Sequence, residues 1–168
     1  ARLQDEEPLV WAARVSIGGV IARAVDGSRA GAEARQIDVV VKGETGLEVT
    51  GNLEQIATAV GNLVANAVAY SGPGTSVVVS AKGHPDTVDV CVLDQGIGIP
   101  ATELGRIFER FYRVDPARHR STGGTGLGLS IVKHVAATHG GDVTVWSAEG
   151  QGSTFTLTLP RRPSEETT

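Results

Sequence analysis

Residues 88–100 constrain this chain most, because they predict a strand that ends in an acid and a glycine-rich turn. Valines at alternate positions from 88 to 92 are typical of a strand with one buried face. Asp94 follows, and then Gly96 and Gly98, whose missing Cβ atoms allow a ligand to approach the backbone. A shielded carboxylate at a strand end can accept a hydrogen bond from an exocyclic amine, such as that of adenine. The same residues also fit an Asx turn that closes a hairpin.

The turn also matches a dinucleotide-binding fingerprint. Residues 96–101 read Gly-Ile-Gly-Ile-Pro-Ala, which fits the pattern G-x-G-x-x-G/A after a strand. That fingerprint requires a second strand ending in an acid about 20 residues further on. Residues 110–120 are instead charged and aromatic, and Pro100 stands where the backbone would have to cradle a pyrophosphate. We therefore set this interpretation aside.

Composition restricts the class of protein. The chain has 168 residues, enough for one domain with a substantial core. Its net charge of −4 indicates no polybasic face for nucleic acid, and no apolar run approaches the roughly 18 residues of a membrane span. The single cysteine, Cys91, excludes a disulfide within the chain, and we expect a buried structural thiol.

One domain containing helices and strands is predicted over residues 11–160. Residues 1–10 are expected to be the remnant of an upstream helix or linker, and residues 161–168 a disordered tail. An Ala-rich helix is predicted over 10–34, interrupted at Gly18-Gly19 and ending near Gly31. Strands are predicted at 37–41, 47–50, 76–81, 88–93, 142–147 and 153–159, and further helices at 54–70, 102–111 and 127–139.

The helix predicted over 54–70 carries polar residues beside its apolar stripe. Gln55, Asn62 and Asn66 fall on one edge of that stripe, and the two asparagines are i,i+4 neighbours. Asn is unfavourable inside a helix because its side chain competes for backbone hydrogen bonds. A spaced pair therefore favours a polar site over a solvated flank. The amide oxygens could help to hold Mg²⁺, together with phosphates and waters.

Residues 112–124 predict a lid or a disordered loop, because the segment lacks apolar periodicity and is long for a connection inside a compact domain. Basic side chains in and beside it are candidate phosphate contacts, although each also fits a solvated surface residue. These are Arg110, Arg113, Arg118 and Arg120.

A glycine-rich segment, residues 123–130, opens the next predicted helix. Backbone N–H groups at such a helix start can face an anion, and the helix dipole favours negative charge there. No Gly-Lys-Ser/Thr follows, so the segment is not a P-loop. A flexible hinge is the alternative, but the preceding lid favours phosphate binding.

Together, these elements resemble the ATP-binding catalytic domain of bacterial sensor histidine kinases, in the GHKL superfamily. The resemblance covers roughly residues 12–160. The sequence of the lid and the F box looks like that of the phosphate-responsive type of sensor kinase in high-GC bacteria. The matching segments are 62–71 for the N box, 94–100 for the G1 box, 106–113 for the F box, 124–129 for the G2 box and 150–155 for the final hairpin.

The resemblance implies a two-layer α/β (α+β) sandwich, with a mixed sheet of about five strands and three helices on one face. It implies that Asp94 binds the adenine amine and that Asn66, with Asn62, holds Mg²⁺. Asn66 and Arg113 are the implied catalytic residues, Arg113 as a phosphate contact. The implied nucleotide-binding residues are Asn62, Asn66, Tyr70, Asp94, Gly96, Gly98, Ile99, Tyr112, Arg113, Gly124, Thr125, Gly126, Leu127 and Gly128.

The implied function is to bind Mg²⁺-ATP and present its γ-phosphate to a histidine on a separate dimerisation domain. Residues 1–10 would then be the end of that domain's helix. The implied partners are this domain and a response regulator, with no nucleic acid or membrane contact. The chain alone would be monomeric, and the whole kinase would be a homodimer and a membrane-anchored sensor with this domain in the cytoplasm.

Two departures from the family pattern qualify this expectation. Ala69 stands where the family often has a lysine that contacts phosphate. None of His84, His119, His134 and His139 lies in the His-Glu context of a phospho-acceptor. We therefore expect this chain to bind Mg²⁺-ATP without phosphorylating itself.

Three alternatives stay open at this point. A GHKL ATPase would use a general-base Glu four residues before the Mg²⁺-binding Asn, where this chain has Asn62. An anti-sigma serine kinase is usually a standalone domain. A non-catalytic nucleotide-binding module would not need the basic edge at residues 106–113, which could dock a histidine-bearing hairpin.

Overall fold

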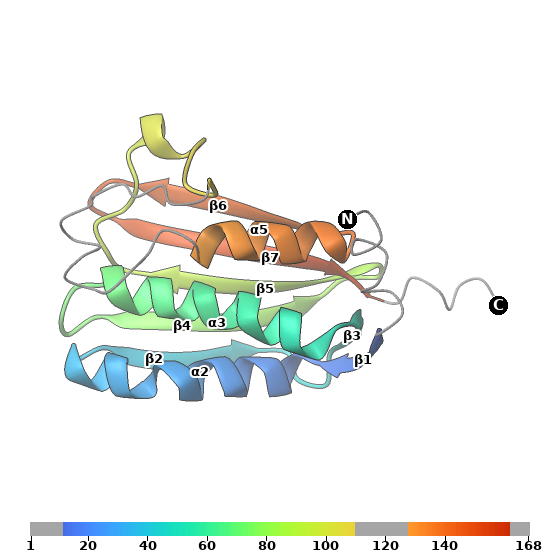
Figure 1. The fold of residues 1–168 in the computed structure, drawn as a ribbon. Helices are drawn as coiled ribbons and strands as arrows, with labels where there is room; N and C mark the ends of the chain where they lie inside the picture. The colour runs from blue at the N-terminus through green and yellow to red at the C-terminus, as the bar shows by residue number, and fades with distance from the viewer. Residues whose placement is uncertain (1–11, 110–127, 162–168) are drawn as a thin grey trace.

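The computed structural model describes residues 12–109 and 128–161 (Figure 1). A mixed five-stranded sheet has the order β2-β4-β5-β7-β6, in which β2 and β4 are parallel and the other pairs antiparallel. Its strands are β2 Asp38–Gly43, β4 Ser76–Gly83, β5 Thr87–Asp94, β6 Asp142–Ala148 and β7 Gly152–Pro160. Helices α2 (Ile17–Ala34), α3 (Leu53–Tyr70) and α5 (Gly128–Thr138) lie side by side on one face. The predicted two-layer architecture is confirmed.

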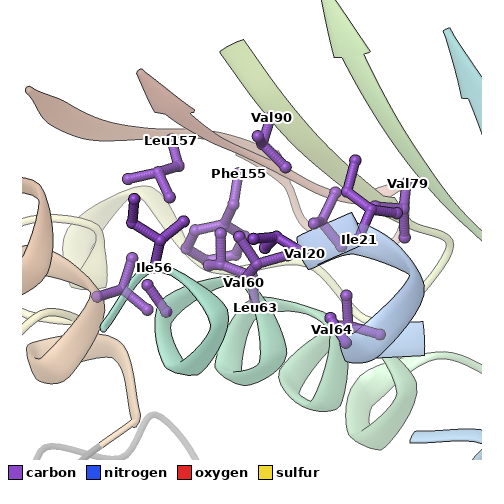
Figure 2. Packing of buried hydrophobic residues seen from close by; sticks show 14 of the residues in the cluster. Val20, Ile21, Ile56, Val60, Leu63, Val64, Val79, Val90, Phe155 and Leu157 are labelled. Carbon is purple, nitrogen blue, oxygen red and sulfur yellow. The ribbon is translucent and has the colours of Figure 1, made fainter. Parts of the chain in front are cut away.

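The core lies between the sheet and these helices (Figure 2). Strand alternation turns every second side chain of β5 and β7 toward the helices, so that Val90 and Leu157 are cross-strand partners in the core. From α3, Val60 and Leu63 meet them. Fully burying an aliphatic or aromatic side chain of this kind contributes about 1.5–3 kcal/mol, so this contact layer fixes α3 against the sheet.

The amino-terminal helix differs from its prediction. Residues before it form β1 (Ala13–Ser16), which pairs antiparallel with β3 (Glu48–Gly51) in a separate two-stranded sheet. The Ser16 hydroxyl accepts a hydrogen bond from the Gly19 N–H (3.1 Å) and caps α2. Both predicted interrupting glycines therefore lie in the first turn, and α2 continues past Gly31 without a break. The prediction was wrong because helical periodicity does not show where a cap residue ends a preceding strand.

The helix predicted over 102–111 is also not an α-helix in its described part. A short 3-10 helix, η1 (Ala101–Glu103), is followed by turns whose hydrogen bonds join residues three apart. Its apolar side still packs on the core, since Ile107 is buried and the Phe108 ring meets Phe155 edge-on at 6.2 Å. The apolar pattern identified the packing face but not the hydrogen bonding, because side chains three apart share a face in both helix types.

Cys91 is not in the core. It lies half-buried on the face of the sheet opposite the helices, with its Sγ 3.5 Å from Thr156 Oγ1. The prediction of a buried thiol was wrong because the alternation that buries Val90 and Val92 turns the residue between them to the other face.

Among the residues that the structure describes, no helix has the length and apolar character needed to cross a membrane.

Hydrogen bonds to other segments fix both ends of helix α3. Near its C-terminus, Arg35 donates through Nε to Val68 O (3.0 Å) and through Nη2 to Ser71 O (3.1 Å). At its N-terminus, the Asn52 N–H donates to His139 Nε2 (3.0 Å), which links α3 to the end of α5. These bonds satisfy backbone groups that a helix end leaves open. His139 therefore makes a structural contact between the two helices.

Removing the Arg35 side chain, which binds carbonyl groups at the C-terminal end of α3, should destabilise the fold. Arg35→Ala is expected to lower the free energy of unfolding by about 1.5–3 kcal/mol, because two carbonyl groups lose a charged donor. Urea denaturation followed by circular dichroism measures the change. Arg29→Ala is the control, since Arg29 lies on α2, which Arg35 follows, and makes an exposed i,i+3 ion pair with Asp26 (3.2 Å). Equal losses in the two variants would contradict the capping role of Arg35.

Candidate nucleotide site

The acid predicted to recognise a base is buried at the end of β5. Asp94 is 5% exposed, and its Oδ1 accepts hydrogen bonds from the N–H groups of Gly96 (2.9 Å) and Ser153 (3.2 Å). Burial raises the pKa of the Asp94 carboxyl, and the two backbone donors act in the opposite direction. Both bonds use Oδ1, so among the described residues Oδ2 has no hydrogen-bond partner. That oxygen can accept from a ligand.

The Asx turn considered above also forms. The bond from the Gly96 N–H to the Asp94 side chain joins residues i+2 and i, which is the defining contact of that turn. The two interpretations of this segment are therefore compatible, because the turn engages one carboxylate oxygen and leaves the other.

The glycines of the turn are packed against the chain itself. Ser71, just after α3, forms an antiparallel bridge with Gly96, and a Cβ on Gly96 would lie 2.1 Å from Tyr70 O. Gly98 has a φ of +76°, and its Cβ would lie 2.1 Å from Ala148 O. From the sequence, these glycines are predicted to allow a ligand to approach the backbone. In the structure, the atoms that approach are carbonyl oxygens at the end of α3 and of β6.

One of the two asparagines of α3 contacts the start of α5. Asn62 Nδ2 donates to Gly128 O (3.3 Å), and Asn66, one turn further on, is half-buried. A pair of amide oxygens fits Mg²⁺, which usually keeps several waters and takes few protein ligands besides phosphate oxygens. Within residues 12–109 and 128–161, no cluster of three or more His, Cys, Asp or Glu side chains offers a complete metal cage.

The other predicted site residues divide into two groups. Tyr70 is the last residue of α3 and is half-buried, and the Ile99 N–H donates to Ser147 Oγ (2.8 Å). The remaining predicted residues lie outside the described part of the chain. They are Tyr112, Arg113, Gly124, Thr125, Gly126 and Leu127.

Sequence reasoning missed the contribution of the β6–β7 hairpin. The Gly150 N–H donates to Ile97 O (2.8 Å), so the hairpin turn holds the segment that follows Asp94. Ser153 is the cross-strand partner of Asp94, and its hydroxyl lies 2.8 Å from that of Ser147. A signal was present in the sequence, because both serines occupy positions that alternation assigns to the apolar, helix-facing side of their strands.

This fold agrees with comparisons to known proteins. Residues 51–163 match the family described as "Histidine kinase-, DNA gyrase B-, and HSP90-like ATPase", and the chain belongs to this family of ATP-binding domains. Within the family, it is a domain of the sensor histidine kinase type.

The relatives support that narrower assignment. The sensor-like histidine kinase SenX3 of Mycolicibacterium smegmatis is 45% identical over 166 residues, which cover 99% of this chain and 43% of that protein. The solved mycobacterial sensor histidine kinase MprB has a TM-score of 0.78 at 33% identity, covering 90% of this chain and 99% of the other. Full-length ShkA in complex with AMPPNP has a TM-score of 0.76 at 28% identity, covering 89% and 31%. The chain thus spans less than half the length of SenX3.

Close packing at the glycine turn leads to a mutational prediction. Gly96→Ala should destabilise the domain and weaken nucleotide binding, because the new Cβ would overlap Tyr70 O and push α3 away from Asp94. Thermal unfolding and nucleotide titration measure the two effects. Gly61→Ala is the control, since a Cβ there meets no neighbouring described atom within 4 Å and should stabilise α3 by up to about 1 kcal/mol. A Gly96→Ala protein as stable as the parent would contradict this packing.

Burial of Asp94 predicts the pH dependence of stability. Because its folded-state pKa is raised, the folded protein binds this proton more tightly than the unfolded chain. Stability from this group is therefore lost as the pH rises from the unfolded pKa through the folded one. Asp94→Asn keeps an acceptor oxygen for both N–H groups and removes the charge. We expect the variant to be at least as stable as the parent near neutral pH, with no such advantage at acid pH.

Unfolding temperatures measured across this pH range test the expectation. If Asp94→Asn loses stability mainly near neutral pH, the ionised carboxylate stabilises the fold. That result would contradict the expectation, in which the charge of Asp94 destabilises the fold.

Proposed function

We propose that this domain binds Mg²⁺-ATP and presents the γ-phosphate to a histidine on a separate domain, as part of a two-component sensor kinase. The observation that carries the proposal is the buried carboxylate of Asp94, which keeps Oδ2 for a ligand donor at the end of β5. Membership of an ATP-binding family and the likeness to ShkA, a relative solved in complex with AMPPNP, support ATP as the nucleotide.

In this proposal, the base is held at the end of β5. Asp94 accepts a hydrogen bond from the adenine amine, while Tyr70 and Ile99 line the base. Tyr70 ends α3 and Ile99 is fixed by its bond to Ser147. Both residues are therefore attached to the elements that hold Asp94. Such prior attachment lowers the conformational entropy lost on binding.

The phosphates would lie between α3 and the start of α5. Asn62 joins the two helices through Gly128, and Asn66 is the next residue along the same face of α3. Asn66 with Asn62 would hold Mg²⁺, which supplies positive charge to the phosphate oxygens when bound. The N–H groups at the N-terminus of α5 favour anions. Arg113, Tyr112 and residues 124–127 complete the proposed site from outside the described residues.

One position favours transfer to a protein over hydrolysis by water. Asn62 lies four residues before Asn66, where a hydrolytic relative would carry a general-base Glu. Its Nδ2 donates to Gly128 O, and an amide does not accept a proton usefully. The site would hold a phosphoryl donor in place without activating water. Ala69, in place of the family's frequent lysine, removes one positive charge near the phosphates.

The acceptor histidine, the response regulator and the membrane anchor belong to the proposal for the whole kinase. The whole kinase would act as a homodimer, with this domain on the cytoplasmic side of the membrane. SenX3 is more than twice as long as its match to this chain, which leaves ample room for such segments.

Calorimetric titration with AMPPNP, with and without Mg²⁺, tests the nucleotide site. The parent should bind, and more tightly with Mg²⁺. Asp94→Asn should lower affinity by about 10-fold or more, because the charge is lost and an amide donor can face the adenine amine. Asp89→Asn is the control, since Asp89 lies on the same strand and binds Thr158 and His84 on the opposite face. A parent that binds no nucleotide would overturn the proposal.

A test of phosphoryl transfer requires the dimerisation domain that would carry the acceptor histidine. Labelled ATP should leave this chain unlabelled by itself and should label an added dimerisation domain from the same kinase on its histidine. Stoichiometric label on the isolated chain, or rapid phosphate release without an acceptor, would contradict transfer to a separate domain.

A further inference from the structure

Strand β2 forms one edge of the five-stranded sheet (Figure 1). It pairs in parallel with β4 on its inner side, and among the described residues no strand pairs with its outer side. Residues 41–43 of the strand are exposed. An exposed edge presents a row of backbone N–H and C=O groups to another strand, and natural proteins usually shorten, bend or charge such an edge to prevent pairing. The side chains of β2 indicate which partner strand this edge fits.

The outward backbone groups of β2 belong to its odd-numbered residues. The N–H groups of Asp38 and Glu44 donate to carbonyl groups on the β4 side (3.1 and 3.0 Å), so the even-numbered residues bond inward. Because N–H and C=O groups alternate in direction along a strand, those of Val39 and Val41 point away from β4. An antiparallel partner can exchange two hydrogen bonds with each of these residues.

The side chains of this edge are arranged symmetrically about Val40. Val39 and Val41 register with buried valines of β4 and therefore face the helices, but Val41 is 53% exposed, so α2 does not cover it. Asp38, Val40 and Lys42 lie on the opposite face, and both charged side chains are exposed. Within residues 12–109 and 128–161, neither of these two charges makes an ion pair. The edge thus carries an unpaired acid and an unpaired base at equal distances from its centre.

We propose that β2 pairs antiparallel with β2 of a second copy of this chain, about a two-fold axis at Val40. In this register, Val39 and Val41 exchange four backbone hydrogen bonds with Val41 and Val39 of the second copy. Asp38 lies opposite Lys42 of the second copy, and the axis repeats this pair. The opposed charges occupy non-hydrogen-bonded positions, where side chains approach most closely. The exposed Val41 gains an apolar neighbour.

The charges favour this register over its neighbours. A shift by two residues in one direction places Asp38 opposite Glu44 of the second copy, which opposes like charges. A shift by two in the other direction places Asp38 opposite Val40 and leaves it without a charged partner. A shift by one residue would oppose outward backbone groups with groups that already bond to β4. A charge that serves only to block an edge requires no such symmetry, so the pattern favours a second copy as the partner.

The proposed interface is small. It involves residues 38–42 of each copy, far fewer than the roughly 20–30 residues a side of a stable interface. We therefore expect the isolated chain to be monomeric at micromolar concentration and to pair as it approaches millimolar. In the homodimeric kinase proposed above, two linked copies would reach an effective concentration of that order, about millimolar for short flexible linkers.

Sedimentation equilibrium at concentrations up to about 1 mM tests the pairing. The parent should form a dimer at the top of that range. Asp38→Lys and Lys42→Asp each replace two attractive pairs by two like-charge pairs and should weaken the dimer about 10-fold or more at low salt. An equimolar mixture of these two variants should associate as the parent does, because opposite charges then meet at both positions. Asp142→Lys, on the opposite edge strand β6, repeats the charge change of Asp38→Lys and should have no effect.

Three results would overturn the inference. The first is a parent that stays monomeric at about 1 mM. The second is a dimer that both charge variants leave intact, which would locate the interface elsewhere. The third is a mixture that associates no better than either variant alone, which would exclude this register. All three substituted side chains are exposed, so the variants should unfold at the temperature of the parent. None of these results bears on the proposed function, because β4 separates β2 from the strand that carries Asp94.

Discussion

Burying the carboxylate of Asp94 is the constraint around which the described structure is arranged. A charge removed from water is costly unless hydrogen bonds replace its hydration. Here the replacement comes from two backbone N–H groups on different segments, Gly96 in the following turn and Ser153 on β7. Those donors can reach Oδ1 only if the turn and β7 approach closely, and Gly96 and Gly152 are the positions where a Cβ would prevent that approach.

The same constraint makes α3 a second organising element. The helix ends against the glycine turn through Ser71, and Arg35 and His139 fix its two ends. Its apolar face packs on the sheet, and its polar edge carries both asparagines, of which Asn62 contacts the start of α5. One rigid helix thus connects the base end of the proposed site with the phosphate end. This rigidity suits phosphoryl transfer, in which positioning and charge provide most of the catalysis.

The family description names gyrase and HSP90 beside histidine kinases. In the proposed site, Asn62 stands where a hydrolytic relative would carry a general-base Glu, and its amide joins α3 to α5 through Gly128 O. On the other side of the site, the β6–β7 hairpin holds the turn after Asp94 through Ile97 and Ile99. The hairpin, predicted from the sequence as the final pair of strands, therefore supports the proposed site as well. The proposed site is thus built by contacts between segments far apart in the chain.

The sequence by itself determined the elements whose signal is local. Alternation located the five strands of the sheet, 3.6-residue periodicity located α3 and α5, and the ordered motifs identified the family. The same local patterns could not locate η1 or the break between β1 and α2, because an apolar period does not specify hydrogen bonding or caps. They also misplaced Cys91 within its strand. Only the tertiary structure decided that the glycines of the turn face the chain's own carbonyl groups, that Ser153 stands beside Asp94 and that Ser147 stands beside Ser153. Those contacts depend on strand register and on which strands become neighbours. The residues that meet are about 50 to 60 positions apart, and no local sequence pattern specifies register or strand order over that separation.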